Sequence, residues 1–332
     1  MKGPRFFLVT GGAGFLGSAL VKRLLAVGHR VRVLDNESRG DVRRLAEVMD
    51  RIEWVQADIR DAGAVSAATK GVDAVCHLAS INGTEFFYTK PELVLEVGVK
   101  GIVNVVDACL ANGIGELILA SSSEVYHQAP RVPTDETAPM VVPDPLNPRF
   151  SYAGNKIITE LYALNFGRHH LERVVVFRPH NVYGPDMGWE HVIPQFALRM
   201  KDLCASTEGR IRFPLQGSGE ETRAFVFIDD FIDGLLTVID RGEHLNIYHI
   251  GTSEEVSIAE VATQVGACFG REIEIVPGEL YEGGTARRCP DVSKLASLGY
   301  VPTYKLREGL PRTVAWYTEH SDRRPKTGDD SK

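Results

Sequence analysis

The sequence predicts an α/β protein built on a doubly wound parallel sheet, with a smaller C-terminal α/β lobe. Three observations predict it. Short, continuously apolar segments alternate with helical ones through the first half of the chain, which is typical of a parallel sheet covered on both faces. A glycine-rich turn follows the first of these segments, and an acidic residue ends the second. After Arg178 prolines punctuate the chain, which indicates that a less regular lobe begins there.

The strand and helix candidates alternate as a doubly wound sheet requires. Six short apolar runs are strand candidates: 6–10, 31–34, 54–57, 74–78, 117–120 and 174–177. A helical spacing of apolar residues covers three longer segments: 15–27, 93–110 and 150–166. Beyond Arg178, the same alternating character returns in three segments and one further helix: 225–228, 231–239, 247–250 and 256–269.

Composition excludes several classes of partner and compartment. The net charge is 37 − 44 = −7, so the chain lacks the broad positive surface that non-specific nucleic-acid binding needs. The five cysteines form no C-x-x-C pair, so neither a disulfide framework nor a metal site is expected. The apolar run Phe6–Val9 is too short for a signal-peptide core. No apolar run reaches the roughly 18 residues of a membrane span, so we expect a cytoplasmic protein with no membrane partner.

The turn after the first strand has the spacing of a dinucleotide site. Its glycines let the backbone approach a pyrophosphate, and the N–H groups that begin the next helix would bind that anion. The residues concerned are Gly11, Gly14, Phe15, Leu16 and Gly17. Asp35 ends the second strand, where a carboxylate accepts hydrogen bonds from the adenosine ribose and repels a 2′-phosphate. This combination predicts a Rossmann domain that binds NAD rather than NADP.

A tyrosine, a lysine and a serine form the candidate catalytic group. Tyr152 and Lys156 stand four residues apart, on one face of a predicted helix. A nearby ammonium stabilises a phenolate, so we expect Lys156 to lower the pKa of Tyr152 from about 10 and make it a base near neutral pH. Ser122 follows the fifth strand, at the edge where doubly wound folds bind ligands. Its hydroxyl could share a substrate proton with Tyr152.

These motifs resemble a known family, the extended short-chain dehydrogenase/reductases that act as nucleotide-sugar epimerases and dehydratases. The resemblance runs in order along the chain to about Tyr317. It rests on TGGAGFLGSAL (10–20), LDN (34–36), ADI (57–59), HLAS (77–80), ASSSEVY (120–126), YAGNK (152–156), RPHNVYGPDM (178–187), TRAFVFIDD (222–230) and RRCPDVSKLASLGY (287–300). One departure is Gly98, where the family usually carries an asparagine.

The resemblance implies a role for each matching residue. Tyr152 would remove a proton from a sugar hydroxyl, usually at C4, while Lys156 binds the nicotinamide ribose and Ser122 assists. Tightly held NAD⁺ would take the hydride, and the sugar would become a 4-keto intermediate. Further cofactor contacts are implied at Asn36, Asp58, Ile59, Leu78 and Ala79. Contacts with a nucleotide-diphospho-sugar substrate are implied at Ser122, Asn181, Arg223 and Arg288.

The fate of the 4-keto sugar decides the reaction, and Glu124 bears on it. Returning the hydride to the other face gives a 4-epimerase, which is the leading hypothesis. Glu124 stands two residues before Tyr126, where similar 4,6-dehydratases and UDP-glucuronate decarboxylases carry a catalytic glutamate. Those two reactions, with Glu124 as a base, remain the alternative. A non-catalytic NAD-binding regulator on the same fold is a third possibility, although it would not need a tyrosine tuned by a lysine.

The chain length sets the expected domain organisation. Residues 1–178 plus about 225–250 would form the NAD-binding domain. Residues about 179–224 plus 251–320 would form the nucleotide-sugar-binding lobe. We expect the polar tail 321–332 to be disordered, because it has no large apolar residue. The resemblance also implies a homodimer, formed through the helices at roughly 91–112 and 150–169.

Overall fold

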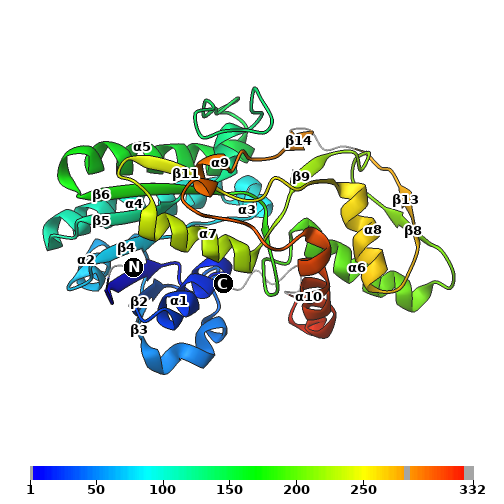
Figure 1. The fold of residues 1–332 in the computed structure, drawn as a ribbon, viewed down its shortest axis with the longest axis horizontal. Coiled ribbons are helices and arrows are strands. Elements are labelled where there is room, and N and C mark those ends of the chain that lie inside the picture. The colour runs from blue at the N-terminus through cyan, green and yellow to red at the C-terminus, as the bar shows by residue number, and fades with distance from the viewer. Residues whose placement is uncertain (1–2, 280–284, 325–332) are drawn as a thin grey trace.

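A seven-stranded parallel sheet forms the centre of the molecule (Figure 1). The computed structural model describes residues 3–279 and 285–324. The sheet order is β11-β6-β5-β4-β1-β2-β3. The first three strands extend from β1 to one edge of the sheet and the later strands extend from β4 to the other, so the strand order reverses between β1 and β4. Its strands are β1 (Phe6–Thr10), β2 (Arg30–Asp35), β3 (Ile52–Gln56), β4 (Ala74–His77), β5 (Glu116–Ala120), β6 (Arg173–Pro179) and β11 (Asn246–Ile250). In such a sheet the ligand site lies where the strand order reverses, beyond the carboxyl ends.

Successive residues of β1 enter two different cores. Phe7 and Val9 pack with helices on one face of the sheet, whereas Phe6 and Leu8 pack with helices on the other. The first face is covered by α1 (Phe15–Ala26) and α7 (Ile228–Arg241), and the second by α2 (Ala62–Thr69), α4 (Pro91–Asn112) and α5 (Ser151–His170). Burial on both faces explains why the strands are continuously apolar.

Helices α4 and α5 approach closely at Gly98. A Cβ placed on Gly98 would lie 1.9 Å from the side-chain oxygen of Asn155, much closer than two such atoms can be. The Asn155 side chain is fully buried and occupies the space that a residue with a side chain at position 98 would need. The departure from the family pattern at Gly98 therefore has a local structural reason.

The second lobe is built from short strands and three longer helices, which stand apart from the sheet in Figure 1. The helices are α6 (Val192–Ser206), α8 (Ile258–Cys268) and α10 (Leu306–Glu319). Three small sheets pair β7 (Val182–Tyr183) with β10 (Val226–Phe227), β8 (Ile211–Pro214) with β13 (Ile273–Val276), and β9 (Thr222–Ala224) with both β12 (Glu255–Ser257) and β14 (Arg287–Arg288). The short helix α9 (Ser293–Ala296) instead packs against β11 and α7, beside the central sheet (Figure 1).

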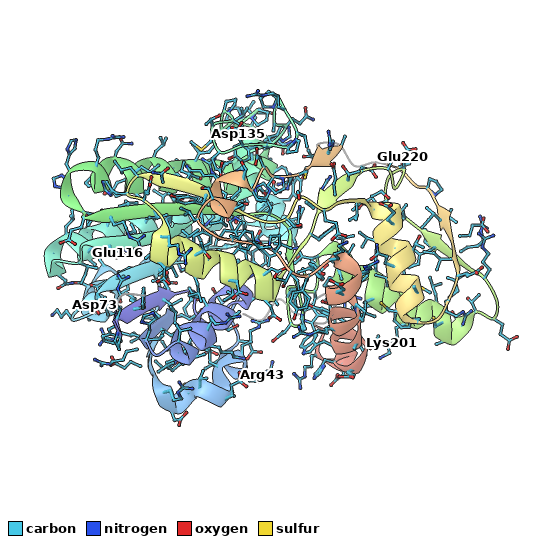
Figure 2. All side chains as sticks on the ribbon, in the orientation of Figure 1. Arg43, Asp73, Glu116, Asp135, Lys201 and Glu220 are labelled. Atoms are coloured by element: carbon cyan, nitrogen blue, oxygen red, sulfur yellow. The ribbon has the colours of Figure 1, made fainter. Side chains whose placement is uncertain are left out.

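Several helical elements were not foreseen from the sequence. They are η1 (Val42–Arg51), α2, α3 (Thr84–Thr89), α6, α9, α10 and the short turns η2 (Ser123–Tyr126), η3 (Pro148–Phe150) and η4 (Ser321–Arg323). Most are short or rich in polar residues, so their formation depends on packing rather than on apolar periodicity. The expected disordered tail begins with ordered residues, because the Lys201 ammonium donates to the Ser321 hydroxyl at 2.6 Å. Figure 2 shows Lys201 beside α10. Residues 325–332 lie outside the described residues.

Candidate active site

A cavity of about 220 Å³ lies where the strand order reverses, between the ends of β1 and β4. Most of the residues expected to contact NAD line it: Gly11, Gly14, Asp35, Asn36, Asp58, Ile59, Leu78 and Ala79. Phe15, Leu16 and Gly17 form the first turn of α1 instead. The first helical hydrogen bond of α1 runs from the Ser18 N–H to the Gly14 carbonyl. The preceding N–H groups are therefore free of helical partners and suited to bind an anion.

The glycine turn has the tight backbone that a dinucleotide site needs. A Cβ on Gly17 would lie 2.1 Å from the Gly11 carbonyl oxygen, so only glycine fits at this position. Asp35 is buried at the end of β2 and accepts hydrogen bonds from the N–H groups of Ala13, at 2.9 Å, and Glu37, at 2.8 Å. Burial raises the pKa of Asp35, which these two hydrogen bonds oppose. The donors hold the carboxyl group at the cavity wall, where ribose hydroxyls would find acceptors.

Three side chains of the cavity wall, Asn36, Asp58 and Arg60, form a hydrogen-bonded cluster. The Asn36 amide donates to Asp58 at 2.9 Å, and Arg60 donates to both Asp58 oxygens at 3.0 and 2.8 Å. The hydrogen bonds from Arg60 hold the pKa of Asp58 down to about 2. Asp58 is therefore a carboxylate across the working pH range and a fixed acceptor for an exocyclic amine or a hydroxyl.

The structure brings Ser122, Tyr152 and Lys156 together at the carboxyl edge of the sheet. Ser122 caps the short turn η2 after β5, where its hydroxyl accepts from the Glu124 N–H at 3.2 Å. Tyr152 and Lys156 are on the first turns of α5, and both are buried. The Lys156 ammonium donates to the Ala120 carbonyl at 2.9 Å and lies 5.7 Å from the centre of the Tyr152 ring. These groups can together exchange a proton with a substrate hydroxyl.

The pKa of Tyr152 moves in the direction opposite to the one expected from its lysine. Burial raises the pKa of the phenol, and a hydrogen bond with Ser122 opposes this only in part. Burial also lowers the pKa of Lys156 to about 8. The pKa of Tyr152 in the chain by itself therefore lies above its ordinary value, because desolvation outweighs the hydrogen bond with Ser122. The lowering expected from Lys156 stays a prediction.

Glu124 is held between two arginines rather than free in the site. Its carboxylate accepts from Arg288 at 2.5 Å and from Arg149 at 3.1 Å. Burial by itself would raise the pKa of Glu124, but the two guanidinium groups outweigh it and lower the pKa to about 2. Glu124 is consequently ionised at neutral pH and has little tendency to take up a proton.

The expected substrate residues after Arg178 also meet at one place. Arg223 on β9 and Arg288 on β14 are neighbours in register. The Asn181 amide donates to the carbonyl of Ala224, the next residue of β9, at 3.2 Å. Burial, together with the charge of Arg288, lowers the pKa of Arg223 to about 10. Two guanidinium groups side by side, one already bonded to Glu124, form a positive site suited to a diphosphate.

A buried ion pair lies beside the candidate catalytic residues. Arg178 at the end of β6 donates to both oxygens of Glu160, at 2.8 and 2.6 Å, and Glu160 lies one turn after Lys156 on α5. Arg178 also donates to the Tyr126 hydroxyl, which bonds in turn to His249. This network ties α5 to the turn that carries Ser122 and Glu124. A second ion-pair group, around Glu116, lies at the opposite end of the strands (Figure 2).

Sequence reasoning missed two side chains that border the site. Phe87 on α3 stacks on the Tyr152 ring, with centres 5.0 Å apart and planes 15° apart. The Arg149 guanidinium lies 5.4 Å from the centre of the Phe87 ring while it bonds to Glu124. The one available signal for Arg149 was its position three residues before Tyr152. Phe87 had no signal, because its helix is too short to show periodicity.

The described residues hold neither a metal-binding cluster nor a membrane-spanning helix. Across residues 3–279 and 285–324, no group of three His, Cys, Asp or Glu side chains is arranged to hold a metal ion. No helix in this part of the chain has the length and apolar character needed to cross a membrane.

The fold and the site define an NAD-dependent enzyme of the short-chain dehydrogenase/reductase type. The model of the NAD dependent epimerase/dehydratase family matches residues 7–251, and the chain belongs to this family. When bound, NAD supplies the hydride acceptor and donor of the family's reactions. A sequence that carries both this site and this family match is an enzyme, rather than the non-catalytic regulator considered above.

Three relatives illustrate the range of reactions. The chain is 32% identical to a UDP-glucose 4-epimerase from Mycolicibacterium smegmatis, over 95% of this chain and 99% of the relative. It is 31% identical to a UDP-N-acetyl-alpha-D-glucosaminuronate decarboxylase from Bacillus cytotoxicus, over 94% and 97%. It superposes on an NAD-bound dTDP-glucose 4,6-dehydratase from Streptomyces venezuelae with a TM-score of 0.83 and 31% identity, over 95% and 98%. Similar identities to enzymes of different activity assign the chain to nucleotide-sugar modification but not to one reaction.

The ion pairs of Glu124 predict how stability responds to acid. The folded-state pKa of about 2 is below the ordinary 4.5, so the stabilisation is complete above pH 4.5 and is lost as the pH falls through 2. Glu124→Gln should therefore be less stable than the wild type at neutral pH, and the difference should shrink between pH 4.5 and 2. Urea unfolding at several pH values would measure it. A difference that does not change with pH would contradict the ion-pair account.

Proposed function

We propose that this enzyme is a nucleotide-sugar 4-epimerase. Tyr152 takes the proton from the C4 hydroxyl of the sugar, Ser122 shares that proton, and Lys156 balances the charge of the phenolate. C4 would become a ketone, with the hydride acceptor and donor supplied by bound NAD. Once the sugar has presented its other face and C4 has been reduced again, Tyr152 gives the proton back to the C4 oxygen. Atoms and electrons therefore balance with no other reactant.

The ion pairs of Glu124 support epimerisation over dehydration. A 4,6-dehydratase needs a base that removes the C5 proton and a donor to the departing hydroxyl. Glu124, with a pKa of about 2 and both oxygens engaged, is a weak base, and its neighbour Ser123 is buried. A 4-epimerase needs no acid or base at C5. Of the reactions considered, it therefore asks least of the residues beyond Ser122, Tyr152 and Lys156.

Decarboxylation of a nucleotide uronate is the second candidate, and Arg149 favours it. Arg149, whose guanidinium pairs with Glu124 and lies over the Phe87 ring that stacks on Tyr152, could bind a carboxylate at C6. Once C4 is a ketone, a C6 carboxylate is a β-keto acid, which loses CO₂ as the C–C electron pair moves into the enolate. That step needs no C5 base, although the enolate must later take up a proton at C5.

Mass spectrometry of the products separates these reactions. The purified chain would be incubated with neutral and uronic UDP-, dTDP-, GDP- and ADP-sugars. An isomer of unchanged mass supports the epimerase, loss of CO₂ the decarboxylase, and loss of water the dehydratase. Arg149→Gln is the informative variant, because it should reduce turnover of a uronate much more than turnover of a neutral hexose. No product from any nucleotide sugar would contradict the whole proposal.

We also propose that two copies of the chain pair through α4 and α5. Their outer faces expose the large apolar side chains of Leu95, Ile158, Leu161 and Phe166, and adjacent exposed apolar residues of this size are typical of a protein interface. Leu161 is 51% exposed, so Leu161→Asp should convert the dimer to a monomer by burying a charge in the interface. Light scattering after gel filtration measures the mass. Val301→Asp, at a residue 71% exposed elsewhere, should leave it unchanged.

A further inference from the structure

Two segments that leave the sheet from different strands border the cofactor cavity. One is the loop after β2, which contributes Ser38, Arg39 and Gly40 to the cavity wall. The other follows β4, contributes Ser80 and Ile81, and continues into α3. Neither segment belongs to the glycine turn.

Arg39 joins these two segments. Its guanidinium carbon lies 4.5 Å from the centre of the Phe86 ring on α3, within the range of a cation–π contact. One of its nitrogens is 3.1 Å from the place where a Cβ on Gly83, at the start of α3, would lie. Arg39 is therefore both a wall of the cavity and a bridge from the β2 loop to α3.

The bridge lies among acidic groups and beside the catalytic tyrosine. Burial lowers the pKa of Arg39, and the carboxylates of Glu85 on α3 and Glu190 in the second lobe oppose this in part. Phe87, the residue after Phe86, stacks on Tyr152. Helix α3 therefore contacts Arg39 through Phe86 and Tyr152 through Phe87.

We propose that Arg39 and Phe86 form a strap across the cofactor cavity that slows the release of NAD. For the dinucleotide to leave, the β2 loop and α3 must separate, and the contact between Arg39 and Phe86 resists that separation. A retained cofactor is an advantage when the hydride returns to the same molecule of substrate. The proposal does not depend on which nucleotide-sugar reaction follows.

The rate of NAD release from the purified full-length chain tests the strap. The protein would be loaded with radiolabelled NAD, freed of excess by rapid desalting, and diluted into unlabelled NAD while bound label is counted. Arg39→Ala and Phe86→Ala should each release NAD about three- to tenfold faster than the wild type. The double variant should be no faster than the faster single variant, because both substitutions break one contact.

Three further variants sharpen the test. Tyr88→Ala changes an exposed aromatic residue on the same helix and should release NAD at the wild-type rate. Arg39→Lys keeps the charge but loses the planar group and should be nearly as fast as Arg39→Ala. Phe86→Leu keeps apolar volume without a ring and replaces Phe86→Ala if that chain does not fold. Unchanged release in the Arg39 and Phe86 variants would overturn the proposal. Faster NAD release from Arg39→Ala but not from Phe86→Leu would also overturn it. Arg39 would then retain NAD by its charge alone and not through its contact with Phe86.

Discussion

Tyr152→Phe should reduce turnover of the nucleotide sugar about 10²- to 10⁴-fold, the usual contribution of a positioned acid–base group. The substitution removes a single hydroxyl, the one that a hydrogen bond joins to Ser122. The phenylalanine ring can keep the stacking on Phe87 that holds position 152 in place. The variant should therefore fold normally and bind NAD like the wild type.

The measurement pairs an activity assay with the NAD content of the same preparation. Tyr162→Phe is the matched control, because Tyr162 lies on the same helix and stacks on Phe166 away from the cofactor cavity. It should retain wild-type turnover. If Tyr152→Phe kept full activity with its NAD in place, Tyr152 would not be the acid–base group and the mechanism proposed above would fail.

Glu160→Gln should produce the largest loss of stability, about 3–5 kcal/mol of unfolding free energy. Glu160 and Arg178 are among the most deeply buried charged residues, at 0% and 1% exposure. Arg178 directs two hydrogen bonds to the Glu160 carboxylate. The glutamine fits the same space, but it leaves the guanidinium charge without its counter-charge in the interior, where water cannot replace it.

Urea unfolding at neutral pH measures this loss. The control is Glu53→Gln, which breaks ion pairs of an exposed carboxylate with Arg30 and Arg32 and should cost less than about 1 kcal/mol. A loss of similar size in both variants would mean that the buried pair contributes no more than a surface pair. Because Glu160 is one turn from Lys156, the variant should also lose activity as its site loosens.

Much of the fold could be predicted because its determinants are local. The strand β1 was predicted at its observed limits, 6–10, since an apolar run that ends in glycines depends on few distant contacts. The glycine turn and the four-residue spacing of Tyr152 and Lys156 are likewise local patterns. The helix α3 was not predicted because its six residues are too few to show an apolar periodicity. Its position depends on a distant contact, the stacking of Phe87 on the Tyr152 ring.

The electrostatics of the site could not be predicted in the same way. Glu124 and Arg288 are far apart in sequence, and their pairing depends on the second lobe bringing β14 over the end of β5. Sequence reasoning could propose Glu124 as a base but could not see the two arginines that keep it ionised. The same holds for Tyr152, whose burial is a property of the whole fold.

The contact of Asn155 with Gly98 couples the choice of residue on two helices. With Asn155 in its present position, a Cβ at position 98 would lie 1.9 Å from the side-chain oxygen, so Gly98→Ala requires the buried amide to move. A smaller residue at position 155 would leave room for that side chain. The effects of substitutions at the two positions on stability should therefore be non-additive.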